Sequence, residues 1–187
     1  LNVMKQNTER LLNLTNQLLD FRKTESQGFR LNFAKCNITE VLKETHVRFT
    51  SLAKQKGLEF TLQVPEKDFY AHVNREAFTK IISNLLNNGV KYAESYVRIS
   101  LEVPETDEDH SFHIRTENDG VIIPNEMKEE IFKPFVRFNE KEDGKVTAGT
   151  GIGLALSRSL TELHQGTLVM GKGETNNTFC LTLPMAQ

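Results

Sequence analysis

Three glycines at alternate positions lead directly into an apolar-periodic helix between residues 149 and 156 (Gly-Thr-Gly-Ile-Gly-Leu-Ala-Leu). Glycine tolerates positive φ and lets the backbone approach a ligand closely. The first turn of a helix presents unpaired N–H groups and the positive end of the helix dipole. Together these features predict an anion site, and the usual anion is a phosphate. A flexible loop followed by the start of a helix would contain the same glycines and is the alternative. Other segments of the chain are needed to distinguish a phosphate site from such a loop.

The bulk composition narrows the class of protein. A chain of 187 residues can build one core and an appendage. Its 23 basic and 25 acidic side chains give no excess that would favour nucleic acid as a partner. No apolar run has the length of a membrane span, and no signal peptide opens the chain. We interpret Cys36 and Cys180 as reduced thiols in a cytoplasmic setting, with a single disulfide as the alternative.

The first 27 residues have the pattern of a helix with an unpaired apolar side. Its seam has steps of three and four, as in a heptad repeat, and consists of Met4, Asn7, Leu11, Leu14, Leu18 and Phe21. Leu12 and Leu19 widen the seam, which favours a helix bundle over a two-stranded coiled coil. We expect its partner to be a second copy of the chain or a helix upstream of Leu1, because the chain begins in the middle of the pattern. Packing on its own domain is the alternative.

The remaining helices and strands are grouped rather than strictly alternating. Capping and apolar periodicity predict a helix from Ile38 to Gly57 with Asn37 as its N-cap, a helix from the N-cap Asn74 onward and a helix over 150–164. A short helix and its exit are predicted over 127–135. Alternation predicts strands over 31–36, 58–64, 69–73, 96–103, 111–116, 167–170 and 178–183. This grouping favours an α+β fold, a two-layer α/β sandwich with the helices on one face of a mixed sheet.

A polar stripe accompanies the apolar side of the helix that follows Asn74. Asn84, Asn88 and Lys91 fall within about 60° of one another at 100° per residue. Asparagine is a poor residue inside a helix, because its side chain competes for backbone hydrogen bonds. We interpret the stripe as an amide-lined site for a hydrated cation beside a phosphate-binding lysine, with a solvated face as the alternative. The polar stretch 138–148, just before the glycines, has the composition of a mobile lid.

Three other kinds of binding site are excluded because the sequence lacks the residues or the spacing that each requires. The Gly166–Gly173 region nearly spells a P-loop, but position 173 is not Ser or Thr and the segment lies between predicted strands. The glycines from Gly149 lack the third spacing and the preceding strand of a dinucleotide fingerprint. The five histidines have no metal-binding spacing, and we expect His113 and His164 to be structural or exposed.

Four segments taken together resemble the ATP-binding domain of sensor histidine kinases, whose fold is shared with gyrase-type ATPases and related chaperones. In the family's terms they are the N box (84–92), the G1 box (118–124), the F box (131–138) and the G2 box (149–156), in the family's order and spacing. The likeness covers about residue 30 to the end, so we divide the chain into a partial dimerisation helix (1–27) and an ATP-binding domain (28–187). The run 16–22 resembles the second helix of the family's dimerisation hairpin, in the style of Bacteroides-type hybrid two-component sensors.

The resemblance implies roles for single residues. Asn84 would hold Mg²⁺, Asn88 and Lys91 would contact phosphate or ribose oxygens, and Arg137 would reach the terminal phosphates. The base would lie beside Tyr92, Gly120, Thr178 and Asn118, the last at an adenine-reading position where the family more often has Asp. The phosphate cradle would come from the glycine turn. The complete nucleotide set is Asn84, Asn88, Lys91, Tyr92, Asn118, Gly120, Ile123, Arg137, Gly149, Thr150, Gly151, Ile152, Gly153, Leu154 and Thr178.

The implied function is transfer of the γ-phosphoryl group of Mg-ATP to a histidine outside these residues. Implied partners are the protein's own upstream helix, a second copy and a response-regulator receiver domain, within the cytoplasmic part of an inner-membrane sensor. Ile122 replaces the second glycine of the G1 box and, with Asn118, leaves a degenerate, pseudokinase-like dimerisation module as an alternative. A gyrase-type ATPase is a further alternative, but the carboxylate expected next to Asn84 is missing and the nearest is Glu76.

Overall fold

The computed structural model describes residues 2–26, 30–106, 109–138, 149–171, 173 and 175–186. Its helices are α1 (Asn2–Glu25), α2 (Ile38–Gln55), α3 (Arg75–Tyr92) and α4 (Gly153–Leu163), with 3₁₀ turns η1 (Asn125–Met127) and η2 (Glu130–Phe132). Its strands are β1 (Ala34–Asn37), β2 (Glu59–Gln63), β3 (Tyr70–Val73), β4 (Tyr96–Glu102), β5 (Ser111–Asn118), β6 (Thr167–Met170) and β7 (Asn177–Pro184). No helix in this described part of the chain has the length and apolar character needed to cross a bilayer.

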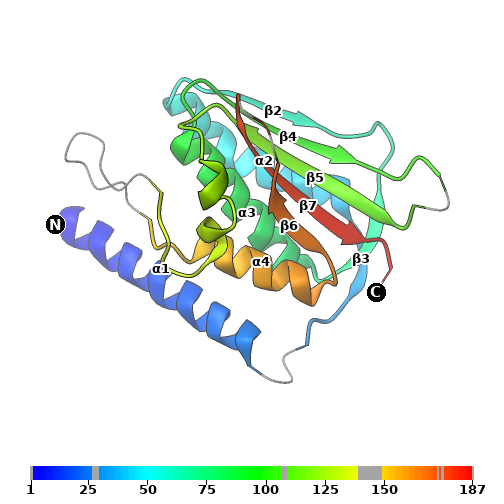
Figure 1. Ribbon diagram of the computed structural model, residues 1–187, viewed down its shortest axis with the longest axis horizontal. Coiled ribbons are helices and arrows are strands. Elements are labelled where there is room, and N and C mark those ends of the chain that lie inside the picture. The colour runs from blue at the N-terminus through cyan, green and yellow to red at the C-terminus, as the bar shows by residue number, and fades with distance from the viewer. Residues whose placement is uncertain are drawn as a thin grey trace.

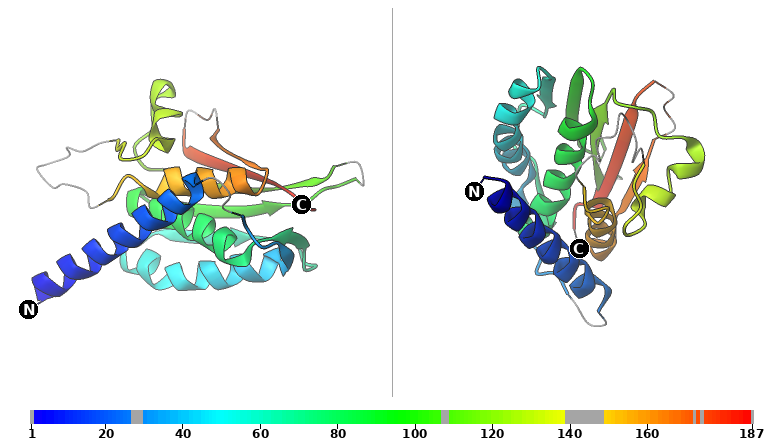
Figure 2. Two further views of the ribbon diagram at one scale, coloured as in Figure 1. Left: turned by 90° about the horizontal axis from the view of Figure 1, so that it is seen from below. Right: turned by 90° about the vertical axis from the view of Figure 1, so that its left-hand side faces the viewer.

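A mixed five-stranded sheet forms one layer of the domain. Its strand order is β2-β4-β5-β7-β6, and only β2 and β4 run parallel within it. Helices α2, α3 and α4 cover one face of this sheet, and α1 lies across the outer side of the helical layer (Figure 1, Figure 2). The predicted two-layer α+β sandwich is therefore confirmed. Strands β1 and β3 pair with each other in a separate antiparallel ribbon.

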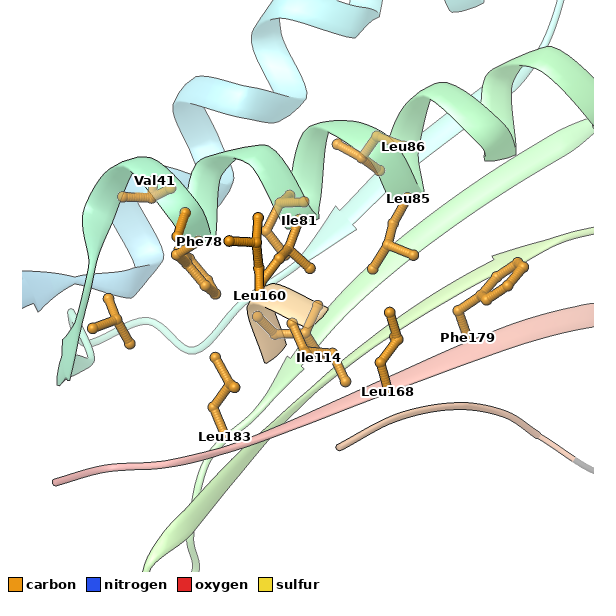
Figure 3. Packing of buried hydrophobic residues seen from close by; sticks show 14 of the residues in the cluster. Val41, Phe78, Ile81, Leu85, Leu86, Ile114, Leu160, Leu168, Phe179 and Leu183 are labelled. Atoms are coloured by element: carbon orange, nitrogen blue, oxygen red, sulfur yellow. The ribbon is translucent and has the colours of Figure 1, made fainter. Parts of the chain in front are cut away.

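The core lies between α3 and the inner face of the sheet (Figure 3). Phe78, Ile81 and Leu85 of α3 are fully buried or nearly so, and they face Ile114 of β5 and Leu181 of β7. Each such side chain stabilises the fold by about 1.5–3 kcal/mol through burial. Alternation along β5 points its even-numbered residues inward, so this apolar row ends at a buried polar residue, Asn118.

Two predicted N-caps are confirmed. Oδ1 of Asn37 accepts the N–H of Glu40 at 3.1 Å, and Oδ1 of Asn74 accepts the N–H of Ala77 at 2.9 Å. Each bond satisfies a backbone donor that the first turn of a helix leaves unpaired, which stabilises the helix by about 1 kcal/mol. Gly57, at φ +71°, follows α2 in the left-handed conformation, so the predicted stop of that helix is also confirmed.

Three local predictions are wrong. The segment 127–135 contains only the turn η2 and the end of η1, because Lys133, before Pro134, is held in an extended conformation that ends any helix there. Helix α4 begins at Gly153 rather than at Thr150, since Gly151 has φ +69° and cannot belong to a right-handed helix. Apolar periodicity also predicts that Leu52 lies on the buried side of α2 with Val41 and Leu42, but Leu52 is 41% exposed.

Helix α1 packs on its own domain through part of its heptad seam. This arrangement was the alternative to packing on a second copy or on an upstream helix. Phe21 is buried in the main core, Leu14 packs against that core, and Asp20 forms a 3.0 Å ion pair with Lys80 of α3. Met4 and Leu11 of the same seam are 75% and 63% exposed. Other apolar side chains of α1 also remain exposed, namely Leu12, Leu18 and Leu19.

Candidate functional site

A cavity of about 430 Å³ opens between α3, the loop 149–152 (the glycine-rich loop) and the ends of β5 and β7. This volume lies within the range of small-molecule sites. Six separate segments of the chain supply its walls: residues of α1, α3, the end of β5 with the turn after it, the stretch 131–138, the stretch 149–154 and β7. Twelve of the residues predicted from the sequence line it: Asn84, Asn88, Lys91, Tyr92, Asn118, Ile123, Arg137, Gly149, Thr150, Gly151, Gly153 and Leu154.

The helix period of α3 brings its polar stripe to the cavity, as the sequence predicted. Nδ2 of Asn84 donates to the carbonyl of Gly153 and to Oγ of Ser157, each at 3.2 Å. Both acceptors belong to α4, so these bonds tie the two helices together and fix the orientation of the amide. The carboxamide oxygen of Asn84 accepts no hydrogen bond from the described residues and is therefore available to a ligand.

Lys91 places a positive charge at the glycine-rich loop. Its Nζ donates to the hydroxyl of Tyr92 at 2.7 Å and lies 4.4 Å from the centre of that ring. A Cβ at position 149 would lie only 2.8 Å from this Nζ, so Gly149 leaves room for the ammonium group. The loop and α4, whose N-terminus follows it, add the positive end of a helix dipole. The combination of ammonium, open backbone and helix start suits a phosphate group.

The glycine-rich loop is held against the segment that precedes it by a conformation that only glycine adopts easily. Gly151 has φ +69°, and its carbonyl accepts the N–H of Phe135 at 2.8 Å. An added Cβ would lie 2.8 Å from Cα of Phe135, closer than side-chain atoms approach backbone. The two segments identified as the F box and G2 box are therefore in direct backbone contact.

The turn after β5 is fixed by a carboxylate. Asp119 accepts the backbone N–H groups of residues 94–96 and the hydroxyl of Ser95. Burial acts to raise the pKa of Asp119, but these hydrogen bonds outweigh burial and lower the pKa to about 2. Next to it, a Cβ at Gly120 would lie 2.0 Å from the carbonyl oxygen of Tyr92, so only glycine fits there. The turn is thus clamped to the end of α3.

Two asparagines face each other across β5 and β7 at the buried wall of the cavity. Asn118 and Asn177 are Cα partners in the strand register and are 5% and 4% exposed. Asn177 binds the turn: its Oδ1 accepts the N–H of Ile123 at 2.9 Å, and its Nδ2 donates to the carbonyls of Gly120 and Val121. Oδ1 of Asn118 accepts the N–H of Gly120 at 3.2 Å.

Three predicted nucleotide residues do not line the cavity. Ile152 is fully buried, and Gly120 acts through its backbone in the turn. Thr178 donates to Oδ1 of Asn176 at 3.2 Å and lies on the other side of β7 from the cavity. Ile122 is 36% exposed and also does not line it, so its branched side chain does not narrow the site. Residues 139–148 of the predicted lid lie outside the described residues.

The structure adds wall residues that the sequence did not predict. They are Asn13 and Gln17 of α1, Asn87, Val121, Ile131, Val136, Phe138, Asn177 and Phe179. Strand alternation would have found Asn177, because it shares parity with the inward-facing Phe179 and Leu181. No sequence signal indicated the two residues of α1, since only the tertiary packing brings that helix to the cavity.

The polar groups that line the cavity suit Mg²⁺ bound together with phosphates better than a metal ion that protein side chains alone would coordinate. Among the described residues no three His, Cys, Asp or Glu side chains gather into a metal cluster. Mg²⁺ commonly keeps several waters and takes one or two protein oxygens together with the phosphates of a substrate. The free carboxamide oxygen of Asn84, beside the phosphate-suited loop, matches that kind of binding.

Comparison with known proteins identifies the family. The profile of the histidine kinase-, DNA gyrase B- and HSP90-like ATPases matches residues 73–187. The chain belongs to this ATPase family, and its relatives within the family are sensor histidine kinases. WalK of Bacillus subtilis (strain 168), a sensor histidine kinase, is 27% identical over 186 residues, which are 97% of this chain and 30% of WalK. The chain therefore spans less than a third of that relative.

Solved structures show the same fold. ShkA, whose full-length structure was determined in complex with AMPPNP, matches with a TM-score of 0.85 and 22% identity over 100% of this chain and 38% of ShkA. The histidine kinase ThkA, solved in complex with the response regulator protein TrrA, matches with a TM-score of 0.76 and 22% identity over 98% of this chain and 50% of ThkA.

Proposed function

We propose that the cavity binds ATP with Mg²⁺ and that this domain supplies the γ-phosphoryl group to a histidine outside these 187 residues. The observation that carries the proposal is the convergence of Asn84, Lys91 and the glycine-rich loop on one rim of a cavity whose buried wall is neutral and largely apolar. A triphosphate suits the cationic rim, and an aromatic base suits the wall.

In this proposal the chain's own residues act by position and charge. Lys91 and the N–H groups at the start of α4 bind the phosphates. The Asn84 oxygen would hold Mg²⁺, which would supply neutralisation of phosphate charge. In the transfer the bond from the γ-phosphorus to the bridging oxygen breaks, a bond to the histidine nitrogen forms, and ADP leaves. Such a reaction asks little covalent help of the protein, so orientation of the nucleotide is the domain's main contribution.

Two alternatives are disfavoured by particular residues. A degenerate, pseudokinase-like dimerisation module was suggested by Ile122 and Asn118 together, but the Ile122 side chain is exposed and away from the cavity. A water-activating ATPase would need a carboxylate beside Asn84. Glu76 instead forms an ion pair of 2.9 Å with Lys80 and does not line the cavity. We therefore expect slow ATP hydrolysis by this chain.

The intact protein would act with partners. We infer a homodimer formed through α1 and an upstream helix, because Met4, Leu11 and Leu12 remain exposed on that helix. The complex of ThkA with TrrA supports a response-regulator receiver domain as the second partner. From the likeness to sensor histidine kinases we also propose that this domain is the cytoplasmic part of a sensor anchored in the inner membrane.

Calorimetric titration tests the proposal. ADP and a non-hydrolysable ATP analogue should bind the chain, more tightly with Mg²⁺ than without it. Asn84→Ala should remove the gain from Mg²⁺, whereas Asn125→Ala, an exposed asparagine of η1 outside the cavity, should keep it. Absence of nucleotide binding with and without Mg²⁺ would contradict the proposal. Acid-labile phosphohistidine on the chain after incubation with ATP would contradict the placement of the acceptor histidine.

A further inference from the structure

We propose that the buried wall of the cavity presents a hydrogen-bond donor to the base, so that it accepts 6-oxopurine nucleotides as well as adenine nucleotides. The specificity-determining residue is Asn118. This inference rests on the proposed function, since it assumes that a nucleotide occupies the cavity.

The wall around Asn118 is the part of the cavity suited to a base. Ile131 and Phe179 line it and are 5% and 4% exposed, so an aromatic ring there would contact buried apolar surface. The groups suited to phosphate, Lys91 and the glycine-rich loop, are partly exposed at the rim. A nucleotide that places its phosphates at the rim therefore places its base against Asn118.

The orientation of the Asn118 amide is set by the backbone. Its Oδ1 accepts the N–H of Gly120, and Gly120 is clamped against the carbonyl of Tyr92. Its Nδ2 has no hydrogen-bond partner among the described residues. Turning the amide over would bring Nδ2 against the N–H of Gly120, donor against donor, and would lose the existing bond. The amino group therefore faces the cavity.

The neighbouring amide cannot replace this donor with an acceptor. Oδ1 of Asn177 is occupied by the N–H of Ile123, and its Nδ2 is bound to two carbonyls of the turn. Asn177 thus holds the turn in place, and both ends of its amide are occupied. Of the two asparagines, only Asn118 has an amide group, Nδ2, that can bond to the base. Nδ2 of Asn118 is open to the cavity, so a ligand that covers it either supplies an acceptor or leaves the donor unsatisfied.

Hypoxanthine and guanine carry an oxygen at position 6, which accepts a hydrogen bond. Adenine carries an amino group there, which donates, so it faces the Asn118 amino group donor to donor and must offer its ring nitrogen N1 instead. A carboxylate at position 118 would reverse the preference, because it accepts from the adenine amino group and repels a carbonyl oxygen. The chemistry of one side chain thus decides which purine is preferred.

Paired calorimetric titrations with Mg-ADP and Mg-IDP test this inference, because the two bases differ at position 6 and in the proton on N1. We expect the wild-type chain to bind ADP no more than about threefold more tightly than IDP. Asn118→Asp should favour ADP by at least about tenfold. The matched control is Asn87→Asp, an exposed asparagine of the same cavity, which should change both affinities alike.

The outcomes separate the two proposals. A wild-type preference for ADP beyond threefold would overturn the inference on the base while leaving the nucleotide site in place. Absence of binding by either diphosphate would overturn the proposed function together with the inference. The comparison of Mg-ADP and Mg-IDP affinities in the wild-type chain tests the inference even if Asn118→Asp does not fold.

Discussion

The hydroxyl of Thr150 donates a hydrogen bond of 2.7 Å to Oε1 of Gln17, which joins the glycine-rich loop to α1 across 133 residues of chain. The same hydroxyl accepts the N–H of Ile152 at 3.2 Å, one residue before α4 begins. Together with the Asp20–Lys80 ion pair, this bond attaches α1 to the domain at the edge of the cavity. The position of α1 and the conformation of the loop are therefore coupled.

Replacing the hydroxyl should loosen the loop. Thr150→Val removes both hydrogen bonds at nearly constant volume, and each is worth about 1 kcal/mol. We expect amide hydrogen exchange over residues 149–152 to accelerate by about five- to tenfold, measured by mass spectrometry. Thr15→Val is the matched control, because among the described residues the Thr15 hydroxyl bonds only to Leu11 of its own helix. Equal exchange rates in the two variants would show that the Thr150 hydroxyl does not hold the loop.

Restoring the family's glycine at position 122 should not improve nucleotide binding. The Ile122 side chain is exposed and lies outside the cavity, and its φ is not positive, so neither space nor backbone conformation requires glycine. We expect Ile122→Gly to leave the affinity for Mg-ADP within about twofold and to lower the stability by about 0.5–1 kcal/mol through chain entropy. Calorimetry and urea unfolding measure the two effects. A gain in affinity of tenfold would mean that Ile122 restricts the site.

Replacing Gly120, unlike replacing Ile122, should weaken nucleotide binding. Gly120→Ala would place a methyl group 2.0 Å from the carbonyl oxygen of Tyr92, so the turn must move. That shift would also disturb the hydrogen bond from Gly120 to Asn118. We expect Gly120→Ala to weaken Mg-ADP binding by more than tenfold, with a loss of stability above about 2 kcal/mol. A variant with wild-type affinity in the calorimeter would show that the turn has more freedom than its contacts indicate.

Local patterns in the sequence were sufficient for much of the site. The 3.6-residue period alone aligned Asn84, Asn88 and Lys91, and the structure places all three on the cavity. The resemblance to histidine kinases proposed Thr178 for the base, whereas the structure puts Asn177 at the wall. Strand alternation puts Asn177 on the same face of β7 as Phe179 and Thr178 on the other face, so a role for Thr178 beside the base stays a prediction.

Other features depend on tertiary contacts that no short pattern encodes. The heptad seam of α1 predicted an apolar partner, but it could not say that Phe21 would enter this domain's own core while Leu11 stayed exposed. The contact between Gln17 and the glycine-rich loop likewise needs the helix to be placed first. The orientation of the Asn118 amide depends on the geometry of a turn clamped by Asp119, which only the folded chain shows.

Lys56, the residue that follows α2, caps the end of α3, the helix that carries the polar stripe. Nζ of Lys56 donates to the carbonyls of Val90 and Lys91 at 2.8 and 3.0 Å, where α3 leaves its last carbonyls unpaired. A positive charge there also interacts favourably with the helix dipole. We expect Lys56→Met to lower the free energy of unfolding by about 1 kcal/mol, measured by urea titration.

Lys54→Met provides the control for that cap. Lys54 lies in the last turn of α2, and its exposed side chain makes no hydrogen bond or ion pair with the described residues. Its replacement should change stability by less than about 0.5 kcal/mol. Equal losses in the two variants would assign the effect to charge near the end of α2 rather than to the cap on α3.

A buried histidine links the two helices that form the site. His164, at the end of α4, is fully buried: its Nδ1 donates to the carbonyl of Leu160 at 2.7 Å, and its Nε2 accepts the N–H of Asn74 at 3.1 Å. Asn74 is the N-cap of α3. Since one partner can only accept and the other can only donate, the ring is neutral with its proton on Nδ1. Burial lowers the pKa of His164 below its ordinary value of 6.5, although the bond to Leu160 acts in the opposite direction.

The sign of the pH dependence follows from that shift. Below pH 6.5 the unfolded chain takes up a proton on His164 more readily than the folded chain, so the stability from the neutral ring is present above pH 6.5 and declines as the pH falls below it. His164→Gln keeps an acceptor for the Asn74 N–H but does not titrate. Between about pH 7.5 and 5.5 we expect the Tm of the wild type to fall about 2–4 °C further than that of His164→Gln. The other four histidines are present in both proteins, so parallel Tm curves would show that protonation of His164 does not oppose folding.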